Sequence, residues 1–394
     1  MPVSRVELSK RTGISKPAVT RGVGDLIAEG LVLEARLGTA GRHGGRRPTL
    51  LELNPRAAAG VGCMVGIGEL MGCIAGFNGE SEHYETVQFD PLADADTVVG
   101  QMVGLLQLLI AKNRPGRPLL GLGVSVPGLV DVEGRIVTTP HMPGLRDVEL
   151  SKLLEERLGL AAYVESESRV QAIAEGWFGH GRGVDNFVCL EAGAENSAGI
   201  VINGELWRGA HSLAGEVGHT TTGVNRDRCY CDSQGCWEMV ASTTHLLNNI
   251  KTSSIARGRQ SLYHDGELTM SRIVAAANAG DEVVLREIDV HADALAMGIC
   301  NLVLAYDPER IILHGESILL GQRLVEMLRT RVSERLRPWL DYEAPIMLTE
   351  LGTEGALAGA VSLALHGGWG FRDPTVATGG ALTGPPDSPA SQPR

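Results

Sequence analysis

Glu216-Val217-Gly218-His219, followed by Cys229-Tyr230-Cys231-Asp232-Ser233-Gln234-Gly235-Cys236-Trp237-Glu238, is the stretch from which the fold of this chain can be inferred. One imidazole and three thiols, from His219, Cys229, Cys231 and Cys236, match the ligand set of a tetrahedral Cys₃His zinc site. Such a closed shell leaves no position for water, so we expect a structural zinc ion (Zn2+). The alternative is a group of three reduced thiols without metal.

The composition around this stretch is that of a globular chain. The 394 residues allow two or three domains, and a hydrophobic content of 43% allows a sizeable core. No apolar run approaches the ~20 residues that cross a bilayer, and the first residues do not resemble a secretory signal. Seven cysteines are too few for a disulfide scaffold in a chain of this length. We therefore expect a cytoplasmic protein without membrane contact.

Charge divides the chain into two unequal parts. Residues 1–56 carry ten Lys/Arg and five Asp/Glu, a formal charge of +5, although the whole chain carries −12. A small basic segment on a large acidic body is typical of a polyanion-binding module joined to a body with another task.

The basic segment begins with two short helical patterns. Ser4 can cap a helix over residues 5–12, with Glu7 completing a capping box. After a glycine break, Ser15 can cap a second helix over residues 16–29. Two short helices joined by a glycine turn, with a strand behind them, predict a winged helix-turn-helix; an ordinary helical hairpin is the alternative.

In a winged helix-turn-helix, the start of the second helix enters the major groove of DNA. The residues expected to face DNA are Ser15, Lys16, Ala18, Thr20 and Arg21. Residues 31–34 would open the wing, and the glycine-rich basic stretch 38–48 follows it. Arg42, Arg46 and Arg47 of that stretch are expected to reach phosphates or a minor groove, unless the stretch is a plain linker.

The helical pair has no preceding helix to cover its apolar face, which Leu8, Ile14, Val19 and Leu26 are expected to form. The winged module therefore lacks its first helix in this sequence. Three explanations stay open: the true start lies upstream, a partner subunit covers the face, or the module is weakened.

Beyond residue 54 the pattern changes to alternating strands and helices, which predicts an α/β fold with mixed or parallel sheets. We expect a DNA-binding domain with its basic wing at 1–54, an α/β body at 55–369 and a disordered Pro/Gly-rich tail at 370–394. The expected elements are paired strands within 59–75, strands at 119–126, 187–190, 198–202 and 310–313, and helices at 97–111, 150–158, 271–279, 281–305, 319–336 and 354–365.

With Ser125-Val126-Pro127-Gly128 and the closing Gly355-Ala356-x-x-Gly359-Ala360, the zinc-type motif resembles the ROK family of repressors, open-reading-frame proteins and sugar kinases. The likeness is to its transcriptional-regulator branch, with repressors of the xylose, N-acetylglucosamine and glucose types. Asp232 departs from the pattern, which usually has Gly there. The resemblance implies a two-lobed actin-like, ribonuclease H-like fold with a sugar in the cleft and the structural zinc on the four residues named above.

The resemblance also implies which residues contact the sugar. Glu216, His219 and Glu238 match family positions whose side chains bind sugar hydroxyls, and carboxylates are suited to accept hydroxyl protons. Ser166-Glu167 matches the family's Asn-Asp pair at the same sugar. For each of these residues, a surface or supporting role is the alternative.

Sugar kinases of the family carry three phosphate-handling features, and this chain departs from each of them. Met64 stands where the first phosphate hairpin has Asp, with Glu69 adding repulsion, and Glu195 stands in the second phosphate loop. Glu167 replaces the Asp that serves as the kinase base, so it is a degenerate catalytic position. Phosphoryl transfer depends on positioning and charge neutralisation, and we therefore expect no ATP-dependent sugar phosphorylation.

The function that we expect is a sugar-responsive transcriptional regulator, first of all a repressor, that binds double-stranded operator DNA as a homodimer or homotetramer. Its effector would be a sugar, or a phosphorylated or acidic derivative of one. Two alternatives stay open: an ATP-dependent sugar kinase with divergent phosphate loops, and a regulator whose body responds to no ligand.

Overall fold

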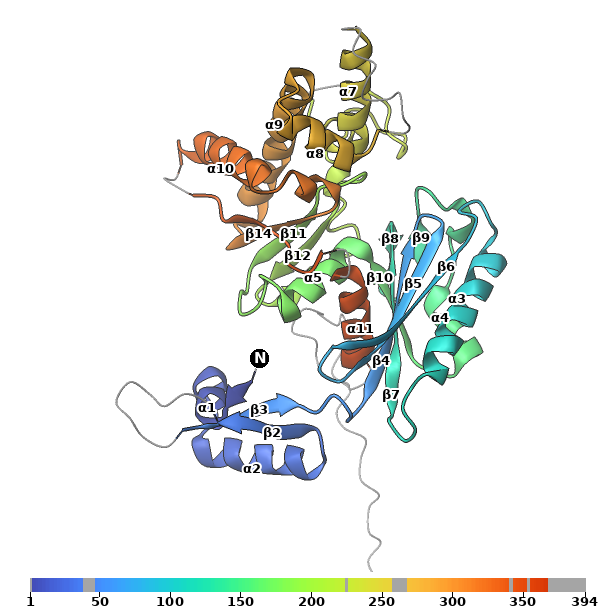
Figure 1. Ribbon diagram of the computed structural model, residues 1–394, viewed down its shortest axis with the longest axis vertical. Helices are drawn as coiled ribbons and strands as arrows, with labels where there is room; N and C mark the ends of the chain where they lie inside the picture. Colours follow the sequence, from blue (N-terminus) through green and yellow to red (C-terminus); the bar gives the residue numbers. More distant parts are fainter. Residues whose placement is uncertain are drawn as a thin grey trace, which may run out of the picture.

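The structure, a computed structural model, describes residues 2–37, 47–223, 226–256, 268–339, 343–352 and 355–367. It consists of a small N-terminal head, residues 2–53, and two α/β lobes, each built on a five-stranded sheet (Figure 1). The first lobe comprises residues 59–166 and the second comprises residues 187–348. Arg42, Arg46 and the expected tail at 370–394 lie outside the described residues.

The head contains two helices and a small antiparallel sheet with strand order β1-β3-β2. Its elements are β1 (Val3–Ser4), α1 (Arg5–Thr12), α2 (Lys16–Ala28), β2 (Val32–Leu37) and β3 (Thr49–Leu53). The predicted helix at 5–12 is confirmed, with the Ser4 hydroxyl accepting from the Glu7 amide at 3.2 Å. The capping box was wrong, because the Glu7 carboxylate pairs with Arg11. Ser15 is confirmed as the N-cap residue of α2, although its side chain forms no capping hydrogen bond.

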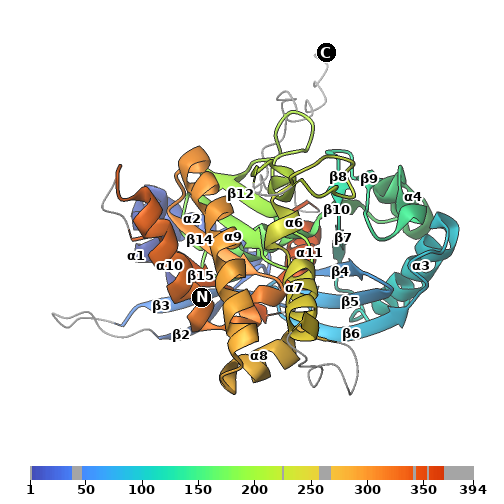
Figure 2. The ribbon, with the colours of Figure 1, turned by 90° about the horizontal axis from the view of Figure 1, so that it is seen from above.

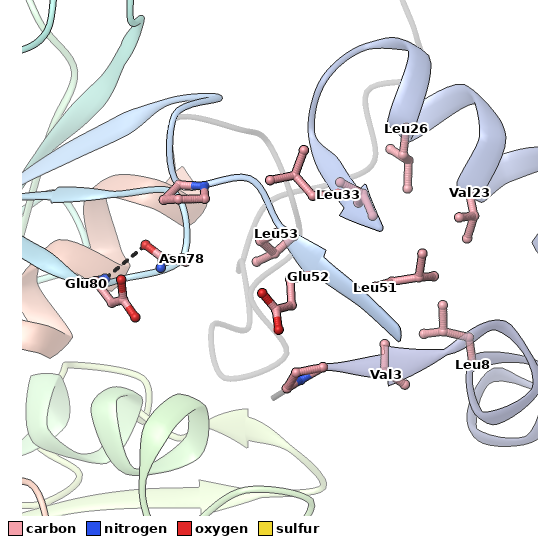
Figure 3. A pocket seen from close by; sticks show the side chains of 13 residues that line it. Val3, Leu8, Val23, Leu26, Leu33, Leu51, Glu52, Leu53, Asn78 and Glu80 are labelled. Carbon is pink, nitrogen blue, oxygen red and sulfur yellow. Dashed lines mark hydrogen bonds between the residues drawn. The ribbon is translucent and has the colours of Figure 1, made fainter. Parts of the chain in front are cut away.

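The head has a very small core. Its buried apolar cluster consists of Val19, Val23 and Leu51, whereas the Ile14 side chain is 50% and the Leu26 side chain 39% exposed. A hollow of about 660 Å³ opens beside this cluster and extends to Asn78 and Glu80 in the turn between β5 and β6 of the first lobe (Figure 3). Of the four residues expected to form the apolar face, Ile14 and Leu26 are thus exposed, whereas Val19 is buried and Leu8 is partly buried.

The first lobe has strand order β10-β7-β4-β5-β6, with β4, β7 and β10 parallel. Its strands are β4 (Ala59–Gly66), β5 (Glu69–Gly76), β6 (Ser81–Gln88), β7 (Leu119–Val126) and β10 (Ala162–Ser166), with a hairpin of β8 (Leu129–Val130) and β9 (Ile136–Thr138) and the 3₁₀ turn η1 (Pro143–Leu145). Helices α3 (Ala95–Ala111) and α4 (Leu150–Leu158) cover the outer face of the sheet, away from the second lobe (Figure 2). Helix α11 (Gly355–Gly367) covers the other face.

The second lobe has strand order β13-β12-β11-β14-β15. Its strands are β11 (Phe187–Glu191), β12 (Ala198–Ile202), β13 (Glu205–Leu206), β14 (Arg310–His314) and β15 (Ile346–Leu348). Helix α5 (Glu167–Phe178) packs on one face. The other side carries η2 (Val217–His219), α6 (Glu238–Ala241), α7 (Thr243–Ala256), α8 (Met270–Asn278), α9 (Glu282–Tyr306), η3 (Glu316–Leu320) and α10 (Gln322–Leu336). By length and composition α9 could cross a membrane, but half of this helix is buried in the core of the lobe.

The expected strands and most expected helices are confirmed within one to three residues. The helix expected from residue 319 is wrong at its start, because Gly321 adopts φ +64° and separates the 3₁₀ turn η3 from α10. The sequence reasoning did not identify α5 or α7.

Helices α5 and α11 pack against each other between the two sheets. A Cβ atom at Gly359 would overlap the Val170 carbonyl oxygen of α5, and a Cβ atom at Gly123 of β7 would overlap the Ala360 carbonyl oxygen of α11. The small residues of the motif at 355–360 therefore allow α11 to approach both α5 and the first sheet. This close packing joins the two lobes.

Candidate functional site

A hollow of about 790 Å³ lies between the lobes, within the usual size of a small-molecule site. The first lobe contributes the β4–β5 turn, the loop after β7, and residues 138–146. The second lobe contributes the β11–β12 turn, the segment before η2 and the turn at 230–233, while the start of α5 lies between the lobes. The predicted sugar residues Ser166, Glu167, Glu216 and His219 line this hollow.

Glu238, the remaining predicted sugar residue, lies behind the wall of the hollow. It is the first residue of α6, is 5% exposed, and accepts a hydrogen bond through Oε2 from the Asn196 amide at 3.0 Å. Its carboxylate therefore supports the β11–β12 turn that forms the wall.

Carboxyl groups dominate the electrostatics of the hollow. Burial raises the pKa of Glu167, and it raises the pKa of Glu216 although Arg169 acts in the opposite direction. Burial, followed by the charges of Glu167 and Glu216, raises the pKa of Glu195 to about 7. Burial likewise raises the pKa of Glu238 to about 7. These carboxyl groups are crowded and share few compensating cations, so they hold protons more tightly than exposed glutamates do.

The four predicted metal ligands come together at the edge of the hollow. The ligand atoms of His219, Cys229, Cys231 and Cys236 all lie within 4.8 Å of one another. The Sγ atoms of Cys231 and Cys236 are 3.6 Å apart, and the Cys229 Sγ is 3.7 Å from the His219 Nδ1. Ligands about 2.3 Å from a tetrahedral centre are separated by about 3.8 Å, so this cluster has the geometry to hold a metal ion.

The other nitrogen of the same imidazole faces away from the thiols. The His219 Nε2 lies 3.1 Å from the Tyr230 hydroxyl and 4.0 Å from the Glu216 carboxylate. A metal on Nδ1 would therefore fix the ring in the orientation that presents Nε2 to the wall of the hollow.

Asp232 occupies a turn position that explains the glycine usual there in the family motif. Its φ is +67°, in the left-handed region that favours glycine but that Asp and Asn tolerate better than other residues. Its carboxylate also pairs with Arg228 at 3.1 Å across the same turn. The substitution therefore leaves the turn that carries the cysteines intact.

A buried ionic network next to the hollow was missed by the sequence reasoning. Glu165, at the end of β10, accepts from Arg169 of α5 at 2.8 Å and from Arg208 of the second lobe at 2.7 Å. Arg169 is 2% exposed and also donates to the carbonyl oxygens of Val130 in the first lobe and Ser212 in the second. The network ties both lobes to the segment that leads to Glu216.

A signal for this network was present in the sequence. Glu165 and Arg169 are four residues apart across a strand-to-helix junction, with Glu167 between them. Opposite charges at this spacing can pair, and charged side chains are buried only when they are paired, although Arg208 lies too far along the chain to be found from spacing.

The part of the hollow that would face a nucleotide phosphate offers few donors. In the β11–β12 turn, the amide of Gly193 donates to the Glu195 carbonyl and the amide of Asn196 donates to Glu238. The Glu195 carboxylate lies 3.0 Å from the His141 Nε2 of the first lobe. Backbone N–H groups that bind phosphate must be free of other acceptors, and these two are not.

Met64 and Glu69 of the first hairpin are also placed away from phosphate chemistry. Met64 packs against the apolar cluster under α11. Glu69 was expected to repel phosphate, but its carboxylate accepts from the Gln88 side chain on β6 at 2.6 Å, and the hollow is lined by Gly66 and Ile67. The expectation for Glu69 was therefore wrong.

The residues expected to face DNA lie on the open side of α2. Ser15, Lys16, Thr20 and Arg21 are exposed and Ala18 is half-buried, while Arg47 is exposed at the start of β3. Within the described residues, neither Lys16 nor Arg21 forms an ion pair with an acidic side chain. Their charges are thus free to meet an anionic surface.

Comparison with known proteins places the chain in a family. The family model described as ROK family matches residues 61–366, so the chain belongs to the ROK family. The xylose repressor of Caldicellulosiruptor bescii is 30% identical over 370 residues, which cover 92% of this chain and 92% of the relative.

Two solved structures show the same fold. A ROK family transcriptional regulator, described as a homologue of the E. coli Mlc protein, matches with a TM-score of 0.76 at 23% identity over 94% of each chain. The ROK family glucokinase of Streptomyces griseus, in complex with glucose and AMPPNP, matches with a TM-score of 0.65 at 26% identity, covering 78% of this chain and 99% of that one. A transcriptional regulator and a glucokinase thus share the fold of the body of this chain.

The buried network gives a first prediction. Burial alone would raise the pKa of Glu165, but Arg208 and Arg169 together hold it below its usual value. Removing the Glu165 charge leaves the guanidinium groups of Arg169 and Arg208 without their carboxylate partner. We therefore expect Glu165→Gln to lower the free energy of unfolding by about 3–5 kcal/mol at neutral pH. Because the folded-state pKa is lowered, the contribution is complete above about pH 5 and is lost as the pH falls through the lowered value.

Chemical denaturation of both proteins between pH 3 and 7 measures this effect. Glu156→Gln, on the exposed face of α4, is the matched control and is expected to change the free energy of unfolding by less than about 0.5 kcal/mol. Equal stability of Glu165→Gln and the unmodified protein at pH 7 would contradict the role assigned to the network.

Proposed function

We propose that this protein is a sugar-responsive DNA-binding transcriptional repressor of carbohydrate metabolism genes. The observation that carries the proposal is the presence, in one chain, of an exposed basic helix on a small head and of a carboxylate-lined hollow in a ROK body. The likeness to a xylose repressor over 92% of both chains supports it. The protein would act in the cytoplasm, associated with the nucleoid when bound to operator DNA.

The head is proposed to be a winged helix-turn-helix. Helices α1 and α2 would be the helix-turn-helix pair, and the β2–β3 hairpin would be the wing. The exposed N-terminal half of α2, with Lys16 and Arg21, would then lie in the major groove, and Arg47 would approach a phosphate next to the wing. In a homodimer or homotetramer, two heads would read a near-palindromic site.

The body is proposed to sense the sugar and to act on the heads through lobe movement. A ligand that contacts Glu167 at the start of α5 and Glu216 of the second lobe stabilises one separation of the lobes over others. The hollow of the head ends at Asn78 and Glu80 of the first lobe, so the two units adjoin where such a movement would be transmitted. Sugar and DNA affinities are then linked, each changing the other by the same factor.

The metal is proposed to be a structural zinc ion. Three thiolates and one imidazole are the donor set of closed zinc sites, which contribute to folding and have no open position for catalysis. The ion would hold the turn at 229–236 against η2 and would thereby position His219 and Glu216.

The body is proposed to lack kinase activity. Met64 packs in an apolar cluster, two amides of the β11–β12 turn are engaged, and Glu195 adds a negative charge where phosphate would lie. Glu167 occupies the position of the catalytic base of the kinases. A base cannot assist phosphoryl transfer, however, when no phosphate is bound.

DNA binding tests the central proposal. We expect a gel shift with DNA from the upstream region of the protein's own locus, with an affinity that falls as salt rises. Arg21→Ala should weaken the binding at least about tenfold and reduce the salt slope by about 1, because one phosphate or base contact is lost. Lys251→Ala, which removes the same charge from the exposed side of α7, is the control.

The same assay separates the alternatives. Addition of a sugar that binds the body should change the DNA affinity. A sequence-specific shift that no bound sugar alters would indicate a regulator that responds to no ligand. The absence of any preference for the locus DNA over unrelated DNA would contradict the proposal.

Phosphoryl transfer is tested by coupled ADP release over a panel of hexoses and pentoses with ATP and Mg²⁺. We expect no sugar-dependent turnover above the rate without sugar, because two amides of the β11–β12 turn are engaged and Glu195 adds a carboxylate where phosphate would lie. ADP formation that rises with sugar concentration, and disappears in Glu167→Gln, would establish the kinase alternative.

Metal analysis tests the zinc proposal. The unmodified protein is expected to contain about one zinc per chain, and Cys231→Ser to lose most of it, since a closed site needs all four ligands. The variant should also melt at a lower temperature and bind sugar more weakly. Cys300→Ser, a buried cysteine in α9 outside the cluster, should retain its metal. Equal zinc content in both variants would contradict the site.

A further inference from the structure

Three carboxyl groups crowd one hollow. Glu167 begins α5, Glu191 ends β11, and Glu195 lies in the β11–β12 turn; all three line the hollow. Glu167 and Glu216 belong to the sugar side already described, whereas Glu191 and Glu195 have no role in it. Two further carboxyl groups in a sugar site call for a reason.

Both of these glutamates are fixed in place. The Glu191 Oε2 accepts from the Ser197 hydroxyl at 2.9 Å, and the Glu191 amide donates to the Ser197 carbonyl. Glu195 Oε1 lies 3.0 Å from the His141 Nε2 of the opposite lobe. Neither carboxylate can turn away from the hollow without losing these contacts, so a ligand meets both of them.

Apart from the His141 imidazole beside Glu195, positive charge is scarce around these carboxylates. Arg146 and the imidazole of His219 are the basic side chains among the described residues that line the hollow. The Arg146 side chain is 70% exposed and lies 3.9 Å from Asp147, and Arg169 and Arg208 are bound to Glu165. No guanidinium or ammonium group is therefore placed to receive a phosphate or carboxylate of a ligand.

The carboxyl groups also act on one another. Burial raises the pKa of Glu191 well above its usual value, and the charges of Glu167 and Glu195 raise it further. An incoming anion would add to this repulsion, a hydroxyl would donate to the carboxylates, and an ammonium group would relieve the repulsion.

We infer that Glu191 and Glu195 are specificity-determining residues that select the ligand by its charge. The cleft takes sugars that carry a protonated amine or no charge, in that order of affinity, and rejects phosphorylated and acidic sugars. This inference rests on the proposed function, because it concerns the effector of the same cleft. It narrows the effector from any sugar derivative to one without a negative charge.

Calorimetry on the full chain at pH 8 and low salt tests the inference. The probes are matched sets of one sugar in several charge forms: glucose, glucosamine, glucose 6-phosphate and glucuronate, with the corresponding galactose and mannose sets. We expect the amino form to bind at least about threefold more tightly than the neutral form, and the anionic forms at least about tenfold more weakly.

The variant Glu191→Gln/Glu195→Gln retains hydrogen-bonding side chains but removes both charges. We expect the ratio between the affinities for the amino form and for the anionic forms to fall by at least about tenfold. Glu195→Gln alone should give part of the effect, and it covers the case in which the double variant does not fold. Glu205→Gln/Glu334→Gln, at two exposed sites of the second lobe, is the charge-matched control.

The outcomes separate the inference from the proposed function. Binding of an anionic form at least as tightly as its neutral form, with or without Mg²⁺, overturns the inference and leaves a sugar-responsive regulator in place. If the double variant still discriminates between the charge forms of one sugar as the unmodified protein does, the inference is also overturned. If no sugar in any charge form binds the unmodified protein, the proposed effector function fails and the inference fails with it.

Discussion

A buried carboxylate shared by two guanidinium groups sets the geometry of the cleft. Glu165 and Arg169 meet because one ends a strand and the other lies one turn into the following helix, while Arg208 arrives from the other lobe. None of these charges is stable in the interior without the others, so the segments that carry them are held together. The carbonyl oxygens of Ser212 and Ala214, bound by Arg169, fix the approach to Glu216.

The packing of α5 on α11 gives this network a rigid base. Glycines along α11 and β7 remove the side chains that would keep these elements apart, and the two sheets are thereby joined through a pair of helices. If one lobe moves relative to the other, α5 and α11 form the axis of this rotation. The β11–β12 turn and the cysteine-bearing turn would then move as parts of the second lobe. This arrangement suits a body in which a small ligand controls the separation of two larger units.

Much of the fold could be predicted because its signals are local. The strand at 119–126 and the helix at 150–158 follow from runs and periods of apolar residues, and the helix at 5–12 follows from a serine cap and a glycine stop. Helix α7 was missed because its Thr, Asn and Ser residues have low helix propensity, and packing against α9 stabilises it instead. Helix α5 was missed because polar residues such as Arg169, Gln171 and Glu175 are buried in it together with its apolar ones, so that its sequence lacks the usual division into a polar and an apolar face.

The amino-acid order was sufficient to find the four residues that cluster as possible metal ligands, the basic helix and the family, because each depends on residues close together along the chain. The direction of side chains required the folded structure. Folding placed Glu238 behind the wall, turned Glu69 towards β6, and brought Arg208 to Glu165. It also gathered Glu167, Glu191 and Glu195 from three separate elements into one hollow, because distances between elements are set by how helices and sheets pack and not by their order in the chain.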